Sequence, residues 1–251
     1  RVLASSVTAA DMMMRRGAPY YGRLFLGIFK PKNGTSGTGF AGEVTEIGSE
    51  VSGFKIGDRV FGETVFGHGS NAEFTAIGED DLIMKMPDDL SYEAAATLCD
   101  GPLTSMNFLK RLADVGPGQR VLIIGASGSL GTAAVQLAKH HGAHVTGVTS
   151  GANEAMVRAL GADQVIDYTK ADFTKTDQVW DVIYDTIGIS SFAISKSKLT
   201  ENGTYLSPVL GGTLWAMLWT SWFGQKRAKF SATGLLPKPV LKQMLGHVRN
   251  L

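Results

Sequence analysis

The spacing of apolar residues divides the chain into two parts with different predicted secondary structure. From Phe40 to Ile77, short alternating apolar runs are separated by glycine, which is typical of small antiparallel strands joined by turns. After Pro87 the periodicity becomes helical, with Ser91 as the expected N-cap of one helix and a second helical stretch from Leu103 to Leu112. The strands expected in the first part are residues 42–47, 57–61 and 71–77.

The second part alternates strands with helices at short intervals. The continuous apolar run Val121–Ile124 is typical of a strand buried on both faces. Strands and helices that alternate in this way predict a parallel, doubly wound sheet, so the expected fold class is α/β with a smaller β-rich part in front of it. The expected strands are 120–124, 144–148, 164–166, 179–184 and 203–207, and the expected helices are 131–141 and 154–160.

One segment, Leu206–Phe223, is apolar enough to raise the question of a membrane span. Glycines at 211 and 212 interrupt it, and it is shorter than the roughly 20 continuous apolar residues that a span requires. The sequence therefore predicts no membrane span. It indicates a lid or buried interface segment, and a wall for a small hydrophobic substrate and a subunit interface explain the apolar residues equally well.

Composition and charge limit the classes of partner. The chain has 251 residues, 44% hydrophobic and 19% charged, with a net charge of +1, so no overall field favours nucleic acid or anionic lipid. Cys99 is the only cysteine, which excludes an internal disulfide and favours a reducing, cytoplasmic setting. We therefore expect small-molecule partners. We separately expect a homodimer. Because the chain starts without methionine and stops within a helical pattern, we also expect it to be a fragment.

A glycine-rich turn follows the first strand of the α/β part and precedes an amphipathic helix. In this context Gly125 permits a tight turn, Gly128 brings the backbone close to a pyrophosphate, and Gly131 allows the helix to pack against the strand. Free N–H groups at the helix N-terminus favour a bound anion. The pattern predicts a dinucleotide-binding turn whose candidate residues are Gly125, Ser127, Gly128, Ser129, Leu130 and Gly131.

The end of the second α/β strand bears on the cofactor's ribose. NAD-preferring sites usually place an acidic residue about 20 residues after the turn, whereas this strand ends in Thr149, Ser150 and Gly151, and Asn153 follows. Arg158 or Lys170 are the bases that would approach a 2′-phosphate, while Glu154 argues mildly for NADH. The sequence favours NADPH over NADH, with Thr149, Ser150 and Asn153 as cofactor-binding residues.

The ordered motifs of the chain resemble the medium-chain dehydrogenase/reductase superfamily, in its zinc-independent quinone oxidoreductase (zeta-crystallin-like) branch. They include Gly57-Asp58-Arg59-Val60, Ala72-Glu73-Phe74, Glu93-Ala94-Ala95-Ala96-Thr97 and Asp185-Thr186-Ile187-Gly188. The resemblance implies a GroES-like catalytic domain over residues 1–98, a Rossmann NADP-binding domain over residues 99–251, and an active site in the cleft between them. It also implies that the chain returns to the catalytic domain after Leu251, which supports the fragment hypothesis.

The resemblance assigns further site residues. Zinc-dependent relatives carry a cysteine early and a Gly-His-Glu motif, but the corresponding stretches, Ser5–Asp11 and Gly37–Gly42, offer neither thiolate nor imidazole. We therefore expect no metal. Thr8 stands where relatives often have asparagine, which leaves the substrate-polarising group in doubt, and Cys99 and the histidines are expected to be structural. By resemblance, Thr104 and Ile187, Leu206 and Ser207 approach the nicotinamide, and Tyr168 lies near the adenosine.

These features indicate an NADPH-dependent oxidoreductase that transfers hydride to a quinone or an α,β-unsaturated carbonyl. The cofactor carries the difficult chemistry while the protein orients the reactants. Thr8 or Ser6 would stabilise developing charge on oxygen, with Thr104 as the second catalytic candidate, and no general acid is evident. Two alternatives remain open: an NADP-dependent alcohol or aldehyde dehydrogenase, and a non-catalytic NADPH-binding sensor.

Overall fold

The computed structural model describes residues 1–17, 23, 27–30, 34–64, 69–210 and 213–231. Its described residues form two compact units, one ending at Leu103 and the other beginning at Thr104. Helix α4 (Gly101–Met106) crosses this point. The two-part α/β organisation predicted from the sequence is confirmed, and the precise boundary between residues 98 and 99 stays a prediction.

The first unit contains a four-stranded antiparallel sheet in the order β1-β2-β3-β4. Phe40, Val60 and Ile83, from three of its strands, form a small buried cluster. Helix α3 begins at the predicted N-cap, where the Ser91 hydroxyl accepts from the Ala94 N–H. The elements of this unit are β1 (Val2–Ser5), α1 (Ala9–Arg16), β2 (Gly39–Glu43), β3 (Arg59–Glu63), β4 (Ile83–Lys85) and α3 (Tyr92–Leu98).

Two strand predictions in the first unit are wrong. Residues 44–47 are not part of a strand, because Val44 instead exchanges hydrogen bonds with Asp58 and Gly57 in a turn. Residues 71–77 also lack strand pairing, since only isolated backbone bonds tie them to the rest of the unit, such as that from Val2 N–H to Glu73 O. Alternation of apolar residues indicates a half-buried segment, but it does not guarantee a neighbouring strand to pair with.

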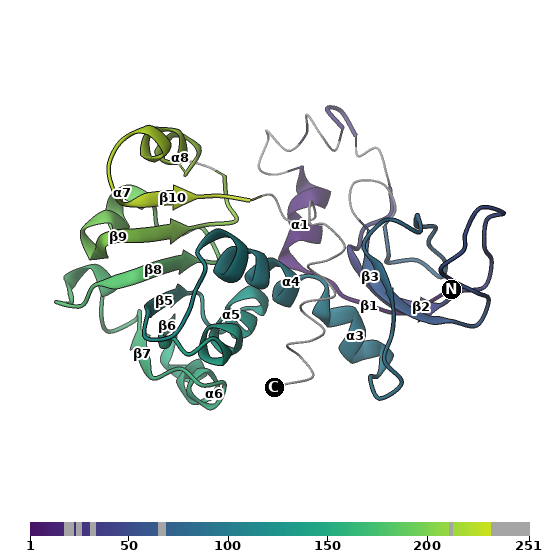
Figure 1. Ribbon diagram of the computed structural model, residues 1–251, viewed down its shortest axis with the longest axis horizontal. Helices are drawn as coiled ribbons and strands as arrows, with labels where there is room; N and C mark the ends of the chain where they lie inside the picture. The colour runs from purple at the N-terminus through teal and green to yellow at the C-terminus, as the bar shows by residue number, and fades with distance from the viewer. Residues whose placement is uncertain (18–22, 24–26, 31–33, 65–68, 211–212, 232–251) are drawn as a thin grey trace. The chain divides into compact units, whose positions relative to one another are not determined.

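The second unit is built on a six-stranded, all-parallel sheet in the order β10-β9-β8-β5-β6-β7 (Figure 1). Read from β7, this is the 3-2-1-4-5-6 order of a doubly wound dinucleotide-binding fold, and its reversal of direction falls between β5 and β8. Ligands of such sheets bind beyond the carboxyl ends of the strands at that reversal. The strands are β5 (Arg120–Ile124), β6 (His144–Thr149), β7 (Gln164–Asp167), β8 (Trp180–Asp185), β9 (Leu199–Leu206) and β10 (Arg227–Lys229).

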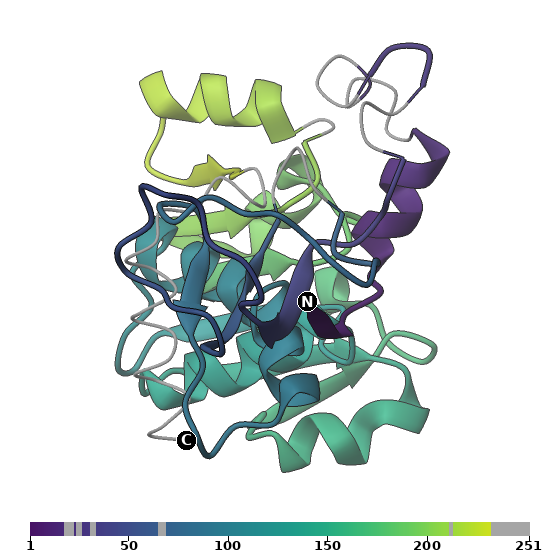
Figure 2. The ribbon, with the colours of Figure 1, turned by 90° about the vertical axis from the view of Figure 1, so that its right-hand side faces the viewer.

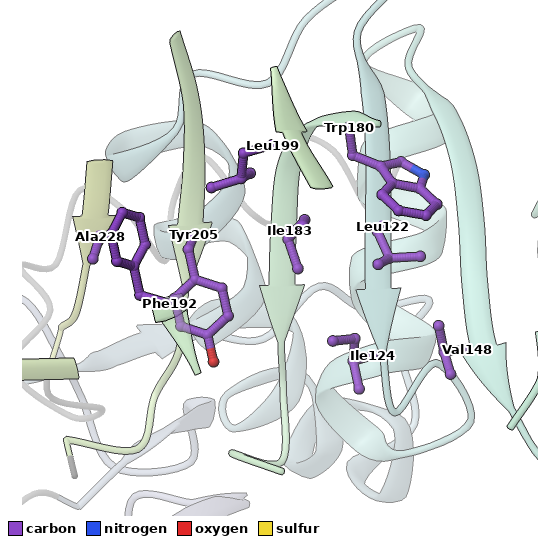
Figure 3. Packing of buried hydrophobic residues seen from close by; sticks show 9 residues of the cluster. All are labelled: Leu122, Ile124, Val148, Trp180, Ile183, Phe192, Leu199, Tyr205 and Ala228. Carbon is purple, nitrogen blue, oxygen red and sulfur yellow. The ribbon is translucent and has the colours of Figure 1, made fainter. Parts of the chain in front are cut away.

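The apolar runs of the strands supply the core, as predicted. Leu122, Ile183 and Tyr205 lie side by side on neighbouring strands, and Trp180 closes one end of the cluster (Figure 3). Burying a large apolar side chain contributes about 1.5–3 kcal/mol, so this cluster is a main source of the unit's stability. The complete cluster is Leu122, Ile124, Val148, Trp180, Ile183, Phe192, Leu199, Tyr205 and Ala228.

Helices connect the parallel strands, and one of them lies within the apolar segment Leu206–Phe223 noted in the sequence. Helix α8 (Thr213–Trp222) contacts β10 and α7 (Phe192–Ser195), and Figure 2 shows it alongside the edge of the sheet. No helix among the described residues has both the length and the hydrophobicity to cross a bilayer. The remaining helices are the π-helical η2 (Asn107–Leu112), α5 (Ser129–His140), α6 (Glu154–Ala159) and the 3₁₀ segments η3 (Gly151–Asn153), η4 (Phe173–Lys175) and η5 (Lys196–Lys198).

Candidate cofactor-binding site

The turn between β5 and α5 has the close backbone packing that its glycines were predicted to provide. Gly125 has φ +80°, which favours glycine, and its N–H donates to the Val148 carbonyl oxygen at 3.1 Å. A Cβ at Gly131 would lie 2.0 Å from the Gly125 carbonyl oxygen, so only glycine fits there. By contrast, a Cβ at Gly128 would lie 3.5 Å from the same oxygen, an ordinary contact. Gly131 is therefore required by the protein itself, whereas Gly128 has room that a ligand can use.

The N-terminus of α5 is uncapped by any side chain. Gly128 is its N-cap, and the first turn consists of Ser129, Leu130 and Gly131. The N–H groups of a first turn lack partners within the helix, and the helix dipole adds partial positive charge at this end. Ser105 of α4 fixes the turn by donating its hydroxyl to the Leu130 carbonyl oxygen at 2.8 Å. The result is a rigid set of donors suited to a phosphate.

A network of hydroxyl and amide groups lies beside this turn at the end of β6. The Ser127 hydroxyl accepts from the Thr149 hydroxyl at 2.9 Å and from the Asn153 amide at 3.3 Å. The same Asn153 amide donates to the Ser150 hydroxyl at 3.2 Å. Four residues predicted separately for the cofactor, Ser127, Thr149, Ser150 and Asn153, thus form one connected polar surface that contains no carboxylate.

The charged side chains near this polar surface form two ion pairs. Arg158 is bound to Glu154 at 2.9 Å, so the base and the acid that the sequence raised as opposing signals neutralise each other. Lys170 lies 3.3 Å from Asp167, and both would lie within 4 Å of a Cβ placed on Gly151. Hydrogen bonds from Thr169, together with Lys170, hold the pKa of Asp167 below its usual value. Lys170 is 80% exposed, which makes it the base nearest to the β6 loop with room to move.

The end of β8 forms the other side of the sheet reversal. The buried Asp185 carboxylate accepts the Gly188 N–H at 2.8 Å, the Ser190 N–H at 2.7 Å and the Tyr205 hydroxyl at 3.1 Å. Burial, and then Asp185, raise the pKa of the Tyr205 phenol, so that it remains a donor. Asp185 thus fixes the loop 186–190 at the carboxyl end of the sheet.

This loop lies directly over the glycine turn. Thr186 donates its hydroxyl to the Ile124 carbonyl oxygen at 2.8 Å, and a Cβ on Gly125 would come within 3.1 Å of Ile187. Asp185 was not among the predicted site residues. The available signal was a carboxylate that ends a buried apolar strand, where such a group needs several donors to offset its desolvation.

The other predicted cofactor residues differ in their exposure to solvent. Ile187 is 51% exposed and Tyr168 is 62% exposed, and both are accessible to a ligand. Leu206 is fully buried in the core, and Ser207 is 1% exposed with its hydroxyl accepting from the Val209 N–H. Neither Leu206 nor Ser207 is therefore accessible to a ligand, and their contacts with the nicotinamide stay predictions.

Both predicted catalytic threonines have defined positions. Thr8 is the N-cap of α1, and its N–H and hydroxyl both donate to the Asp11 carboxylate, at 2.7 and 3.0 Å. That capping box commits the Thr8 hydroxyl to the helix. Thr104 is buried in α4 at 3% exposure. Their catalytic roles stay predictions.

The first unit also contains a buried acidic group that the sequence did not reveal. Glu63, at the end of β3, is 6% exposed, and burial, reinforced by Asp100, raises its pKa to about 8. Burial also raises the pKa of Asp100 and of the Cys99 thiol. Near neutral pH, Glu63 is therefore a carboxylic acid, which can donate a proton or a hydrogen bond.

The described residues around Gly39 offer few ligands for a zinc ion. A Cβ on Gly39 would lie 2.7 Å from the Ser6 hydroxyl and 3.8 Å from the Cys99 Cβ, so these three residues adjoin one another. Zinc binds thiolates, imidazoles and carboxylates in converging sets of three or four. Among the described residues, no three histidine, cysteine, aspartate or glutamate side chains converge as metal ligands.

Comparison with known families assigns each unit. Residues 1–88 match the alcohol dehydrogenase GroES-like domain, and residues 129–213 match a domain described as zinc-binding dehydrogenase. The second match begins at Ser129, within the glycine turn, and covers the first turn of α5, the β6 loop and the end of β8.

Individual relatives are reductases. The chain is 31% identical over 246 residues to the chloroplast envelope quinone oxidoreductase homolog of Arabidopsis thaliana, covering 93% of this chain and 71% of the relative. It is 33% identical over 207 residues to 2-methylene-furan-3-one reductase of Solanum lycopersicum, covering 79% of this chain but 51% of that protein. Among solved structures, the quinone oxidoreductase of Coxiella burnetii is similar, with a TM-score of 0.85, 28% identity, and coverage of 99% of this chain and 78% of the other. The chain thus spans only about half the length of some of the relatives that it matches.

Proposed function

Because the chain belongs to the medium-chain dehydrogenase/reductase superfamily, in its quinone oxidoreductase-like branch, we propose that it is an NADPH-dependent reductase of quinones or α,β-unsaturated carbonyls. The observation that carries the proposal is the turn from Gly125 to Gly131, with its uncapped helix N-terminus, at the strand-order reversal of the sheet. The names of the relatives, quinone oxidoreductase and furanone reductase, support this class of acceptor.

Each part of the dinucleotide has a proposed set of partners. The pyrophosphate lies on the N–H groups of Ser129, Leu130 and Gly131. The nicotinamide lies beyond the ends of β8 and β9, near Ile187, Leu206 and Ser207, of which Ile187 is the exposed residue, and Tyr168 lies on the adenosine side. When bound, the cofactor supplies a hydride from its nicotinamide C4, and the rigid loops fix the direction in which this carbon faces.

The preference for NADPH depends on the polar surface at the end of β6. Ser127, Ser150 and Asn153 present hydroxyl and amide groups that bind a 2′-phosphate without repelling it. Lys170 adds positive charge next to Gly151, and its side chain is 80% exposed, so it can turn from Asp167 towards a bound phosphate. Zinc takes no part in the proposed reaction, and the expected cytoplasmic location and homodimer remain predictions.

Side-by-side titration with NADPH and NADH tests the cofactor, and turnover with a panel of acceptors tests the reaction. We expect tighter binding of NADPH and oxidation of the bound cofactor by quinones or enones, with little turnover of aldehydes. Turnover confined to alcohols and aldehydes would contradict the proposed substrate class. Tight binding of NADPH with no acceptor reduced would identify a binding protein instead.

A further inference from the structure

Helix α8 carries its largest apolar side chains on the outside of the molecule. Four of them follow the spacing i, i+3, i+4 and i+7, which places them on one face of a helix. A surface helix normally turns such a stripe inward. The stripe consists of Trp215, Leu218, Trp219 and Trp222, which are 76%, 47%, 68% and 84% exposed.

The opposite face of α8 packs on the protein with smaller side chains. Thr213 and Thr220 are buried, and Ala216 packs against the core cluster of the second unit. The Thr220 hydroxyl also accepts from the Ala228 N–H of β10 at 3.0 Å. The helix is therefore held in place by its small inner face, and its outward stripe is not needed to attach it.

The stripe continues into a larger aromatic surface. Phe223 follows the helix at 60% exposure, and its ring lies 4.9 Å from that of Trp219. Exposed groups of large apolar residues are uncommon on soluble proteins and mark surfaces that bind something. We call Trp215, Leu218, Trp219, Trp222 and Phe223 the aromatic face of α8.

Cationic side chains lie on the segments that adjoin α8, and one of them, Arg227, donates to the Thr220 carbonyl oxygen of the helix. Arg227 and Lys196 are exposed, and the Lys226 ammonium donates to the Lys196 carbonyl oxygen at 2.8 Å, which brings these segments together. The sequence is polarised in the same sense, since all 23 acidic residues precede residue 202 while six of the 24 lysines and arginines follow it. Although the net charge of the whole chain is +1, its C-terminal fifth contains no acidic side chain.

We propose that the aromatic face of α8 docks onto an anionic lipid membrane, with the helix lying in the plane of the interface. At ten residues, α8 is too short to span a bilayer, but tryptophan rings are favoured at the level of the lipid headgroups. Lysine and arginine beside an apolar helix face are attracted to anionic lipid. This proposal goes beyond the reductase activity and does not depend on it.

Charge also distinguishes lipid from a second copy of the chain as the occupant. A two-fold interface through α8 would bring the same surface of both copies together. Such an interface would gather the cations beside α8 from both copies on one buried surface, and like charges across an interface are unfavourable. An anionic membrane covers the same aromatic surface and neutralises those cations.

Vesicle binding tests the proposal on the unaltered chain. Three of the four tryptophans lie on the aromatic face and the fourth, Trp180, is buried, so tryptophan emission reports mainly on α8. With vesicles of phosphatidylcholine and phosphatidylglycerol we expect a blue shift and quenching by brominated lipid. Vesicles of phosphatidylcholine alone should bind more weakly, and added salt should weaken binding to the anionic vesicles.

Variants distinguish binding through the aromatic face from non-specific adsorption to vesicles. Trp219→Ser removes one exposed ring and should lower the vesicle affinity about tenfold, the effect of losing one inserted apolar side chain. Lys196→Gln should lower affinity for anionic vesicles only. Phe29→Ser and Lys30→Gln are matched controls, since both residues are exposed in the first unit and should leave vesicle binding unchanged.

Three outcomes would overturn the proposal. One is the absence of binding to anionic vesicles at low salt. Another is equal binding by the parent chain and by Trp219→Ser. The third is self-association of the parent chain without lipid that Trp219→Ser abolishes, which would identify a second copy as the occupant.

Discussion

The buried carboxyl of Glu63 makes the stability of the first unit depend on pH. In the unfolded chain this group ionises near its ordinary pKa of 4.5, whereas in the folded unit burial raises the pKa to about 8. Between these two values the folded state holds a proton that the unfolded state has lost, so the free energy of unfolding falls as pH rises. Above about pH 8 both states are ionised, and the dependence due to Glu63 ends.

The magnitude follows from the size of this interval. One proton changes the free energy of unfolding by about 1.4 kcal/mol per pH unit. From pH 4.5 to about 8 the loss amounts to at most roughly 5 kcal/mol. Glu63→Gln keeps the shape of the neutral acid but cannot ionise, so it should match the parent chain near pH 5 and be more stable near pH 8.

Hydrogen exchange gives the necessary spatial resolution, because all four tryptophans lie between residues 180 and 222 and their fluorescence reports on the second unit. Protection of peptides covering β3, after correction for intrinsic exchange rates, should fall with pH in the parent chain and much less in Glu63→Gln. The exposed Glu50→Gln variant controls for loss of one negative charge. Parallel pH profiles for the parent chain and Glu63→Gln would refute the reasoning.

Three further predictions concern the second unit. Gly131→Ala should destabilise the second unit by about 1–3 kcal/mol, since the new Cβ meets the turn's own backbone. Gly128→Ala should leave the free energy of unfolding unchanged but weaken the binding of NADPH. Denaturation and NADPH titration of both variants check this. Lys170→Gln should weaken the binding of NADPH several-fold and leave the affinity for NADH unchanged, and Arg158→Gln is the control. Titration with both cofactors checks this, and an equal loss of affinity for both would contradict the assignment of Lys170 to the 2′-phosphate. Asp185→Asn should lower the free energy of unfolding by roughly 2–4 kcal/mol, because the amide keeps only one acceptor oxygen and turns a donor towards buried N–H or O–H groups. Urea melts followed by tryptophan fluorescence check this, and an unchanged midpoint would show that the loop does not need the carboxylate.

The sequence predicted the second unit more accurately than the first, for a physical reason. Strands such as β5 are buried on both faces and consist of continuous apolar residues, and the prediction for β5 matched its bounds. The first unit depends on three- to five-residue strands and isolated backbone bonds, as around Val44 and Glu73. Such pairings are set by contacts distant in the chain and leave little periodicity to detect.

In the candidate site, too, features set by local sequence were predicted and features set by distant contacts were not. The glycine turn follows a local rule, and its residues could be predicted by spacing. The roles of Asp185 and Glu63 depend on burial and on partners far along the chain, as with the Asp185–Tyr205 hydrogen bond. The position of Asp185 at the end of an apolar strand was a local signal, but its partners could not be predicted from it. The outward stripe of α8 was visible as an apolar segment, but its direction depended on which face packs against the core.

The single cysteine of this chain allows local opening of the first unit to be measured by thiol modification. Cys99 is fully buried beside Ser6 and Gly39, and its raised pKa keeps it in the unreactive thiol form. A thiol reagent can therefore modify it only after the surrounding structure opens, and mass spectrometry would detect one addition per molecule. The rate of that addition measures how often the first unit opens under native conditions, without any mutation or attached probe.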